Sequence, residues 1–194
     1  MGDNVFEGCT SLTSVTLPAG LTQIESNCFK GCTSLREINL GHVTRYGSAA
    51  FMCCSSLKDV AIAEGTTSLP LACFRECTSL RSVTLPATLT NAGSGSFYES
   101  NNIEHVYCWA TTPPAITDWT FSHYGTLHVQ PGCKSAYEAT EYWNKFTIVD
   151  DLTTGISALG AASQSQPAYD MQGRRGTGLT HGIVIQGGRK RVVK

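Results

Sequence analysis

Phenylalanine returns along the first half of the chain at an almost constant step. Phe6, Phe29, Phe51, Phe74 and Phe97 are separated by 23, 22, 23 and 23 residues. A fixed period of about 20–50 residues is the signature of repeat architectures, in which each unit buries its apolar side chains only by stacking on its neighbours. The period therefore predicts an elongated solenoid and constrains the fold more than any other feature of the sequence.

Four further columns keep the same phase as the phenylalanines. A cysteine follows each Phe after three residues, a leucine after six, a valine or isoleucine after nine, and another apolar residue after eleven, with few exceptions. The central part of each unit has the pattern L-x-x-V-x-L. This pattern predicts a short strand in which one outward side chain separates two inward ones. Stacked strands of this kind predict a parallel sheet along one side of the solenoid, with a spacing of about 4.8 Å.

The pattern F-x-x-C-x-x-L-x-x-V-x-L-P resembles the BspA-type leucine-rich repeats of bacterial cell-surface and secreted proteins, many of them from Bacteroidetes. The resemblance covers residues 1–108. It implies a mainly β, right-handed leucine-rich-repeat solenoid of about five rungs of 22–23 residues. It also implies adhesion and binding of matrix proteins. The asparagine that follows the strand in better-known leucine-rich repeats is absent, so the turns must satisfy their backbone groups in another way.

The repeat weakens after the fifth unit, where Ser100 replaces the cysteine, and we expect a C-terminal cap to follow. Solenoids need an atypical terminal unit to cover the open core. Residues 109–150 are assigned to this α/β cap, with a strand around Leu127, then a helix, then a last strand at 146–149. Residues 151–167 are interpreted as a linker because they are small, polar and aperiodic.

Residues 168–194 form a basic tail that we expect to contain a β-hairpin. Its apolar residues flank the turn sequence QGG. Six Lys or Arg and one Asp follow residue 151, which gives +5 there and −6 for the body. The tail resembles C-terminal segments of secreted Bacteroidetes proteins, which implies a sorting signal or a surface-attachment β module. The alternative is a stray hairpin packed on the cap.

The chain has no apolar run of about 18 residues, so no transmembrane segment is expected. Its first residues, MGDNVFEG, have neither the basic region nor the apolar stretch of a signal peptide. They begin inside a repeat unit, and we expect the native protein to start further upstream. Together with the resemblance, these features favour a secreted or cell-surface location.

The cysteine column is interpreted as a ladder of buried thiols. Cys9, Cys32, Cys54 and Cys77 stand in phase with the inward Phe, Leu and Val residues. A free cysteine behaves as a small buried hydrophobe. We therefore expect all four thiols to be inaccessible to solvent.

Metal binding and disulfide formation are the alternatives for the cysteines. The two C-x3-C pairs that begin at Cys28 and Cys73 lie two rungs apart, roughly 10 Å, which is too far to share one zinc ion. No metal or other cofactor is therefore expected. Because the chain has nine cysteines, at least one stays unpaired, and Cys108 with Cys133 is the best candidate pair if a disulfide forms.

No enzymatic motif is recognisable, and we expect the protein not to be an enzyme. The chain contains the histidines His42, His105, His123, His128 and His181. None lies in a nucleophile motif such as G-x-S-x-G, and the GSGS at Gly93 lacks the lysine of a phosphate loop. His123 and His128 flank a predicted turn with Asp118 nearby, and we interpret them as surface or hydrogen-bonded residues.

The outward positions of the strands are the candidate binding site. Arg36, Lys58 and Arg81 share one column, with Glu37 and Asp59 beside it. The candidate residues on this face are Arg36, Glu37, Asn39, Lys58, Asp59, Arg81, Thr84, Glu104, His105 and Tyr107. Solenoids commonly supply broad recognition surfaces of this kind. A solvated charge ladder without a partner is the alternative.

The predicted function is a non-enzymatic protein-binding or adhesion module, whose partner is a host matrix or bacterial-surface protein. One alternative is a carbohydrate-binding module that holds a glycan with the cap aromatics Trp109 and Trp119. Another is a structural spacer that carries the sorting tail. Nucleic acid is not an expected partner, because the net charge is −1 and no nucleic-acid-binding fold surrounds the basic tail.

Overall fold

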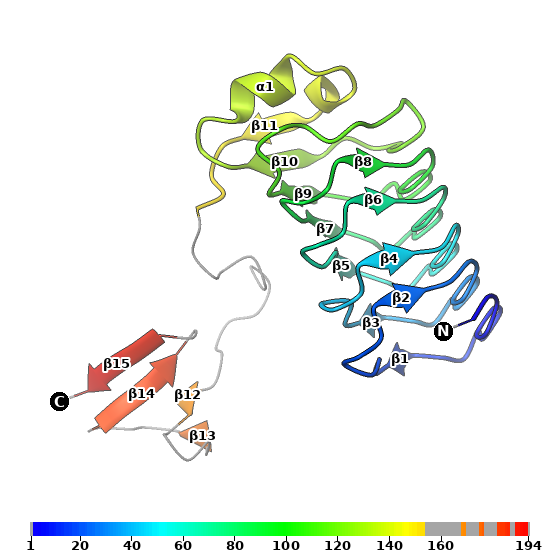
Figure 1. The fold of residues 1–194 in the computed structure, drawn as a ribbon, viewed down its shortest axis with the longest axis horizontal. Coiled ribbons are helices and arrows are strands. Elements are labelled where there is room, and N and C mark those ends of the chain that lie inside the picture. Colours follow the sequence, from blue (N-terminus) through cyan, green and yellow to red (C-terminus); the bar gives the residue numbers. More distant parts are fainter. Residues whose placement is uncertain (1, 154–167, 170–174, 177–181, 187–188, 194) are drawn as a thin grey trace. The chain divides into compact units, whose positions relative to one another are not determined.

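The chain divides into two units, Met1–Thr153 and Thr154–Lys194. The computed structural model describes residues 2–153 of the first unit, and 168–169, 175–176, 182–186 and 189–193 of the second. The first unit is a β-solenoid with little helix (Figure 1). This confirms the fold class that the repeat period predicts.

A parallel sheet runs along one side of the solenoid (Figure 1). Its strands are β5 (Asp59–Ala61), β7 (Ser82–Leu85), β9 (His105–Cys108), β10 (Thr126–Val129) and β11 (Thr147–Val149). Towards the N-terminus, β1 (Ser14–Val15) pairs with β3 (Glu37–Ile38), also in parallel. Val60, Val83 and Val106 stand opposite one another and are buried. The valine column therefore faces inward, as the sequence pattern predicts.

Shorter parallel ladders follow the sheet strands in each rung and form a further side of the solenoid. They pair β2 (Gln23–Ile24) with β4 (Arg45–Tyr46), and β6 (Ser68–Leu69) with β8 (Asn91–Ala92). Ile24, Leu69 and Ala92 are buried, and each of them precedes the turn that leads to the next phenylalanine. The core is therefore enclosed by rung after rung of the same three-part path: sheet strand, short strand and turn.

The phenylalanine rings form one continuous stack. Neighbouring rings lie 5.1–5.6 Å apart between centroids and within 10° of parallel. The stack does not end at Phe97, because Phe121 continues it at 5.1 Å. The solenoid therefore contains a sixth rung, one more than the five that the sequence pattern indicates.

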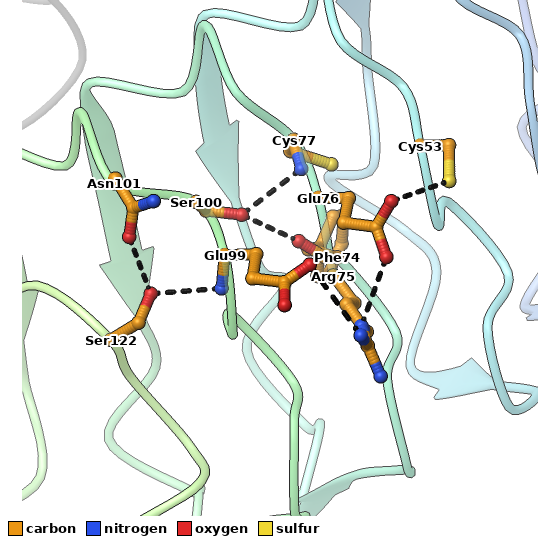
Figure 2. Close-up of polar contacts among 9 residues, drawn as sticks. All are labelled: Cys53, Phe74, Arg75, Glu76, Cys77, Glu99, Ser100, Asn101 and Ser122. Carbon is orange, nitrogen blue, oxygen red and sulfur yellow. Dashed lines mark hydrogen bonds and ion pairs between the residues drawn. The ribbon is translucent and has the colours of Figure 1, made fainter.

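The cysteines are hydrogen-bond donors as well as core residues. The thiols of Cys32, Cys54 and Cys77 donate to the carbonyl of the Phe in the preceding rung, at 3.1–3.2 Å. Ser100 makes the same bond to Phe74, at 3.0 Å, and also accepts one from the backbone N–H of Cys77 (Figure 2). The repeat therefore does not give way at Ser100, because the hydroxyl takes over the thiol's role.

The expectation of four buried thiols is wrong for Cys9. Cys32, Cys54 and Cys77 are fully buried, whereas Cys9 is exposed. The reason is its position on the outermost N-terminal rung, where only the second rung packs against it. Cys108 and Cys133 do not form a disulfide, since all nine cysteines are free thiols.

Backbone ladders replace the missing asparagine in the turns. In the third rung, the N–H groups of Ala49, Phe51 and Cys53 each donate to a carbonyl of the next rung, at 2.8–2.9 Å. In the first five turns two positions have positive φ, one two residues before Phe and one two residues after it. These residues are Asn4, Asn27, Ala49, Ala72 and Gly95 before Phe, and Gly8, Gly31, Cys53, Glu76 and Glu99 after it. The turn therefore keeps its shape without depending on one side chain.

The C-terminal end of the solenoid is closed by aromatic residues. Helix α1 (Lys134–Glu138) and the 3-10 helix η1 (Trp143–Lys145) connect β10 to β11. Tyr137 and Trp143 are fully buried, and Trp143 packs on Phe121 at 6.0 Å. Their polar atoms are satisfied, because the Tyr137 hydroxyl donates to the carbonyl of Ala110 and the Trp143 indole to that of Pro114.

The described residues of the second unit form four antiparallel strands. They are β12 (Ala168–Tyr169), β13 (Arg175–Gly176), β14 (Gly182–Gln186) and β15 (Arg189–Val193), in the order β13-β12-β14-β15. The antiparallel pairing of β14 with β15 confirms the hairpin expected in the tail. Residues 154–167, most of the expected linker, lie outside the described residues. Within the described ranges, no helix has the length and apolar character needed to cross a membrane.

We predict that Phe74→Ala destabilises the solenoid by about 3–5 kcal/mol, because it removes a fully buried ring that is stacked on both faces. Phe6→Ala should cost less than about 2 kcal/mol, because Phe6 is half-buried and stacks on one ring only. Urea denaturation of both variants checks this order. Equal losses would contradict the assignment of Phe74 to the middle of a continuous stack.

We also predict that the free energy of unfolding falls as the pH rises above about 8.5. Burial raises the pKa of Cys32 to about 11 and raises the pKa values of Cys54, Cys73 and Cys77 as well. Above about pH 8.5 the unfolded chain loses thiol protons that the folded chain retains, so the unfolded state is favoured.

Denaturation curves between pH 7 and pH 10 under reducing conditions measure this loss. Cys77→Ser is the matched control, because serine does not titrate in this range and Ser100 shows that a hydroxyl fits the column. The variant should show a shallower decline, by about 1.4 kcal/mol per pH unit at most. Identical slopes in the two proteins would show that Cys77 is not protected from ionisation.

Candidate recognition face

The parallel strands display two outward columns on the solvent side of the sheet. Ser82, His105 and Thr126 stand opposite one another in one column. In the other column, Tyr107 of β9 stands between Thr84 of β7 on one side and His128 of β10 on the other. We call this surface, from β1 to β11, the recognition face.

The N-terminal half of the recognition face contains an open depression of about 440 Å³. It is lined by Thr13, Ser14, Arg36, Glu37, Lys58 and Asp59. Three successive rungs contribute one pair of residues each, so the depression follows directly from the repeat. Four of these residues, Arg36, Glu37, Lys58 and Asp59, belong to the candidate set derived from the sequence.

Within residues 2–153, the charged side chains of the depression do not form ion pairs with one another. Within residues 2–153, no ion pair involves Arg36, Lys58 or Arg81, all of which are exposed. Alternating charges of both signs therefore face solvent across neighbouring rungs.

Arg75, which directly follows Phe74 in the turn, differs from these residues because it forms ion pairs. Its guanidinium pairs with Glu76 at 3.1 Å and Glu99 at 3.5 Å (Figure 2). The charges of this turn are thus partnered within the protein, whereas Arg36, Lys58 and Arg81 are exposed and form no ion pair within residues 2–153.

The remaining candidates are distributed along the same face but differ in their roles. The side chain of Asn39 accepts a hydrogen bond from the backbone N–H of Gly41 at 2.9 Å, so it stabilises the local turn. Glu104 stands beside Arg81, one residue before the column of Ser82 and His105, and its N–H donates to the Arg81 carbonyl. Thr84 is half-buried in the Tyr107 column.

The C-terminal half of the face carries a polar cluster that the sequence analysis did not identify. His105 lies 3.0 Å from His128, whose other ring nitrogen lies 2.9 Å from Asp151. The ring of Tyr107 stacks on that of His128, with centroids 4.5 Å apart. Asp118, the acid nearest to His128 in the sequence analysis, instead pairs with Lys145. A signal was present, because both partners are 23 residues apart, close to the repeat period.

The two candidate tryptophans occupy different parts of the rung. Trp109 directly follows β9 and is half-buried. Trp119 is 59% exposed and lies in the turn, where its carbonyl accepts from Gly95 and its ring packs on Tyr98. No ring contact joins the two tryptophans in the described part of the chain, so they do not make a shared aromatic platform.

The half-buried thiol of Cys53 does not have the character of a nucleophile. It donates to a carboxylate oxygen of Glu76 at 3.4 Å (Figure 2). Burial raises the pKa of Cys53, and the bond to Glu76 and its negative charge raise it further. A reactive cysteine needs a lowered pKa, so this turn holds its thiol protonated.

Parallel strands, stacked Phe rings and an outward polar face together define a leucine-rich-repeat solenoid, a class of binding scaffold. The family described as "BspA type Leucine rich repeat region" matches residues 1–128 in six copies. The chain therefore belongs to this family. The six copies agree with the sixth ring of the Phe stack.

Solved structures of bacterial leucine-rich-repeat proteins are similar to this chain. One from T. pallidum has 31% sequence identity and a TM-score of 0.52, covering 54% of this chain and 50% of that one. One from Bacteroides ovatus has 28% identity and a TM-score of 0.48, covering 55% of this chain and 33% of that one. A leucine rich cell surface protein from Faecalibacterium prausnitzii has 26% identity and a TM-score of 0.34, covering 55% and 41%.

The matched segment therefore spans half or less of the length of each of these relatives. Comparison with curated proteins gave no match.

Proposed function

We propose that this chain is a non-enzymatic protein-binding module of an exported or surface-displayed bacterial protein, and that the recognition face contacts the partner. One observation carries the proposal: Arg36, Lys58 and Arg81 are exposed and make no ion pair within residues 2–153. Arg36 and Lys58 line the depression, and Arg81 follows on the next rung. Charges that stay unpaired at a surface are available for complementary charges on another molecule, which gives specificity and a faster encounter.

The partner is a folded or extended protein whose surface carries charges of both signs. The depression offers a basic and an acidic column side by side, with threonine and serine hydroxyls at one end. A polyanion such as nucleic acid would meet Glu37 and Asp59 as well as Arg36 and Lys58, which disfavours it. A matrix protein or another bacterial-surface protein fits this mixed pattern.

Charge reversal tests the proposal. The triple variant Arg36→Glu, Lys58→Glu, Arg81→Glu should lose partner capture from a panel of immobilised matrix and bacterial-surface proteins. Its free energy of unfolding should change by less than about 0.5 kcal/mol per substitution, because these side chains are exposed. Surface plasmon resonance measures capture, and urea denaturation measures stability.

The matched control is Lys30→Glu, Arg45→Glu, Lys134→Glu, which has the same net charge but alters other surfaces. Lys30 pairs with Glu7 in the turn, Arg45 lies on β4, and Lys134 lies in α1. Capture that survives in the control and disappears in the first variant supports the recognition face. Capture unaffected by the first variant but abolished by Trp119→Ala would instead favour binding through the exposed tryptophan, as in a carbohydrate module.

We further propose that residues 168–194 act in sorting or attachment of the exported protein. The support is that these residues belong to a separate unit with its own antiparallel strands, and that the tail is strongly basic. Deletion of residues 168–194 should leave the solenoid folded but reduce its amount at the cell surface. Cell fractionation with surface protease treatment measures this, and unchanged surface exposure would contradict the assignment.

A further inference from the structure

The cluster at the C-terminal end of the recognition face has the geometry of a chelating pair. The Nδ1 atom of His105 lies 3.0 Å from the Nε2 atom of His128. The Nδ1 atom of His128 lies 2.9 Å and 3.0 Å from the two carboxylate oxygens of Asp151. Two neighbouring strands and the segment after β11 supply the three residues, so rigid elements hold both imidazoles.

The positions of the protons follow from these contacts. A carboxylate only accepts hydrogen bonds, so the Nδ1 atom of His128 carries the proton that Asp151 accepts. In the neutral ring, the Nε2 lone pair of His128 then points towards His105. His105 donates from Nδ1 in this arrangement. When its proton resides on Nε2 instead, both facing nitrogens carry a lone pair that can bind an ion.

We propose that His105 and His128 form a binding site for a divalent transition metal, Ni²⁺ or Cu²⁺, on the recognition face. With metal–nitrogen bonds of about 2.05 Å, a separation of 3.0 Å gives an N–metal–N angle of about 94°. That angle matches neighbouring positions in the square-planar or tetragonal geometry of these two ions. A tetrahedral zinc site would require the two nitrogens to move apart by about 0.3 Å.

Asp151 is the orienting partner of this site. A histidine that ligates a metal commonly donates its other N–H to a carboxylate, which fixes the ring and makes the ligating nitrogen more basic. The His128–Asp151 contact has this arrangement before any ion is bound. Stacking of Tyr107 on His128 further restricts the plane of the imidazole.

The local charge favours a cation. The carboxylate of Asp151 lies 2.9 Å from the Nδ1 atom of His128, and its negative charge would attract a divalent ion. Across the residues described, no group of three or more His, Cys, Asp or Glu could hold a metal ion. The protein therefore supplies two ligands, and water or a bound partner supplies the others.

Isothermal titration with NiCl₂ tests the site in the full chain carrying Cys9→Ser, which removes the exposed thiol. The expected result is one Ni²⁺ per chain, with binding lost in His105→Gln and in His128→Gln. Asp151→Asn should weaken binding about 10–100-fold, as for other orienting carboxylates. His123→Gln is the matched control, since His123 is exposed and lies outside the cluster, and it should bind as the parent does.

A second measurement separates loss of the site from loss of folding. Ni²⁺ should raise the thermal unfolding midpoint of the parent and of His123→Gln but not of His105→Gln or His128→Gln. Nitrogen ligation should also appear without a sulfur-to-nickel charge-transfer band. Unchanged affinity in both histidine variants, an equal loss in His123→Gln, or a thiolate band would overturn the proposal. The triple charge-reversal variant should retain Ni²⁺ binding, so this outcome is independent of partner capture.

Discussion

Each rung of this solenoid is stabilised by three kinds of contact with the rung beside it. The phenyl ring of one rung is buried only because another ring covers it, and the turn N–H groups find their acceptors only in the next turn. The thiol or hydroxyl three residues after Phe links the same pair of rungs a third time. The sheet, the recognition face and the histidine cluster are all placed by this repeated contact, because it sets which residues of successive rungs align.

The period of the sequence was sufficient to predict the parallel sheet, the inward columns and the outward face. It was not sufficient for the turns, because backbone N–H and C=O groups form their ladders whatever the side chains are. Ala49 and Ala72 take up positive φ without being glycine. The thiols were predicted to be buried but not to be hydrogen-bond donors, since their acceptor is a backbone carbonyl. For the same reason, Ser100 was interpreted as a loss of the repeat, although it preserves the bond.

The residues of the recognition face could be predicted from the sequence, but whether their charged side chains form ion pairs could not. Alternation along the strand indicates that Arg36 and Glu37 point outward, whereas only coordinates show that Arg36 forms no ion pair within residues 2–153. The histidine cluster was harder to predict, because the rung that contains β10 is shorter between its Phe and its strand. Thr126, not His128, therefore stands opposite His105. The 23-residue spacing indicates that His128 lies near His105, but it does not show that the contact is diagonal.

Because each rung forms bonds only with adjacent rungs, the repeat also determines how the protein responds to a pulling force. The hydrogen bonds of the ladders point along the solenoid axis, so tension applied between the chain ends strains one interface at a time instead of all six rungs together. Rupture of a rung would release about 75 Å of extended chain for its 22–23 residues. A solenoid anchored at one end and held by a ligand at the other would thus lengthen in steps and dissipate the load while its remaining rungs stay folded.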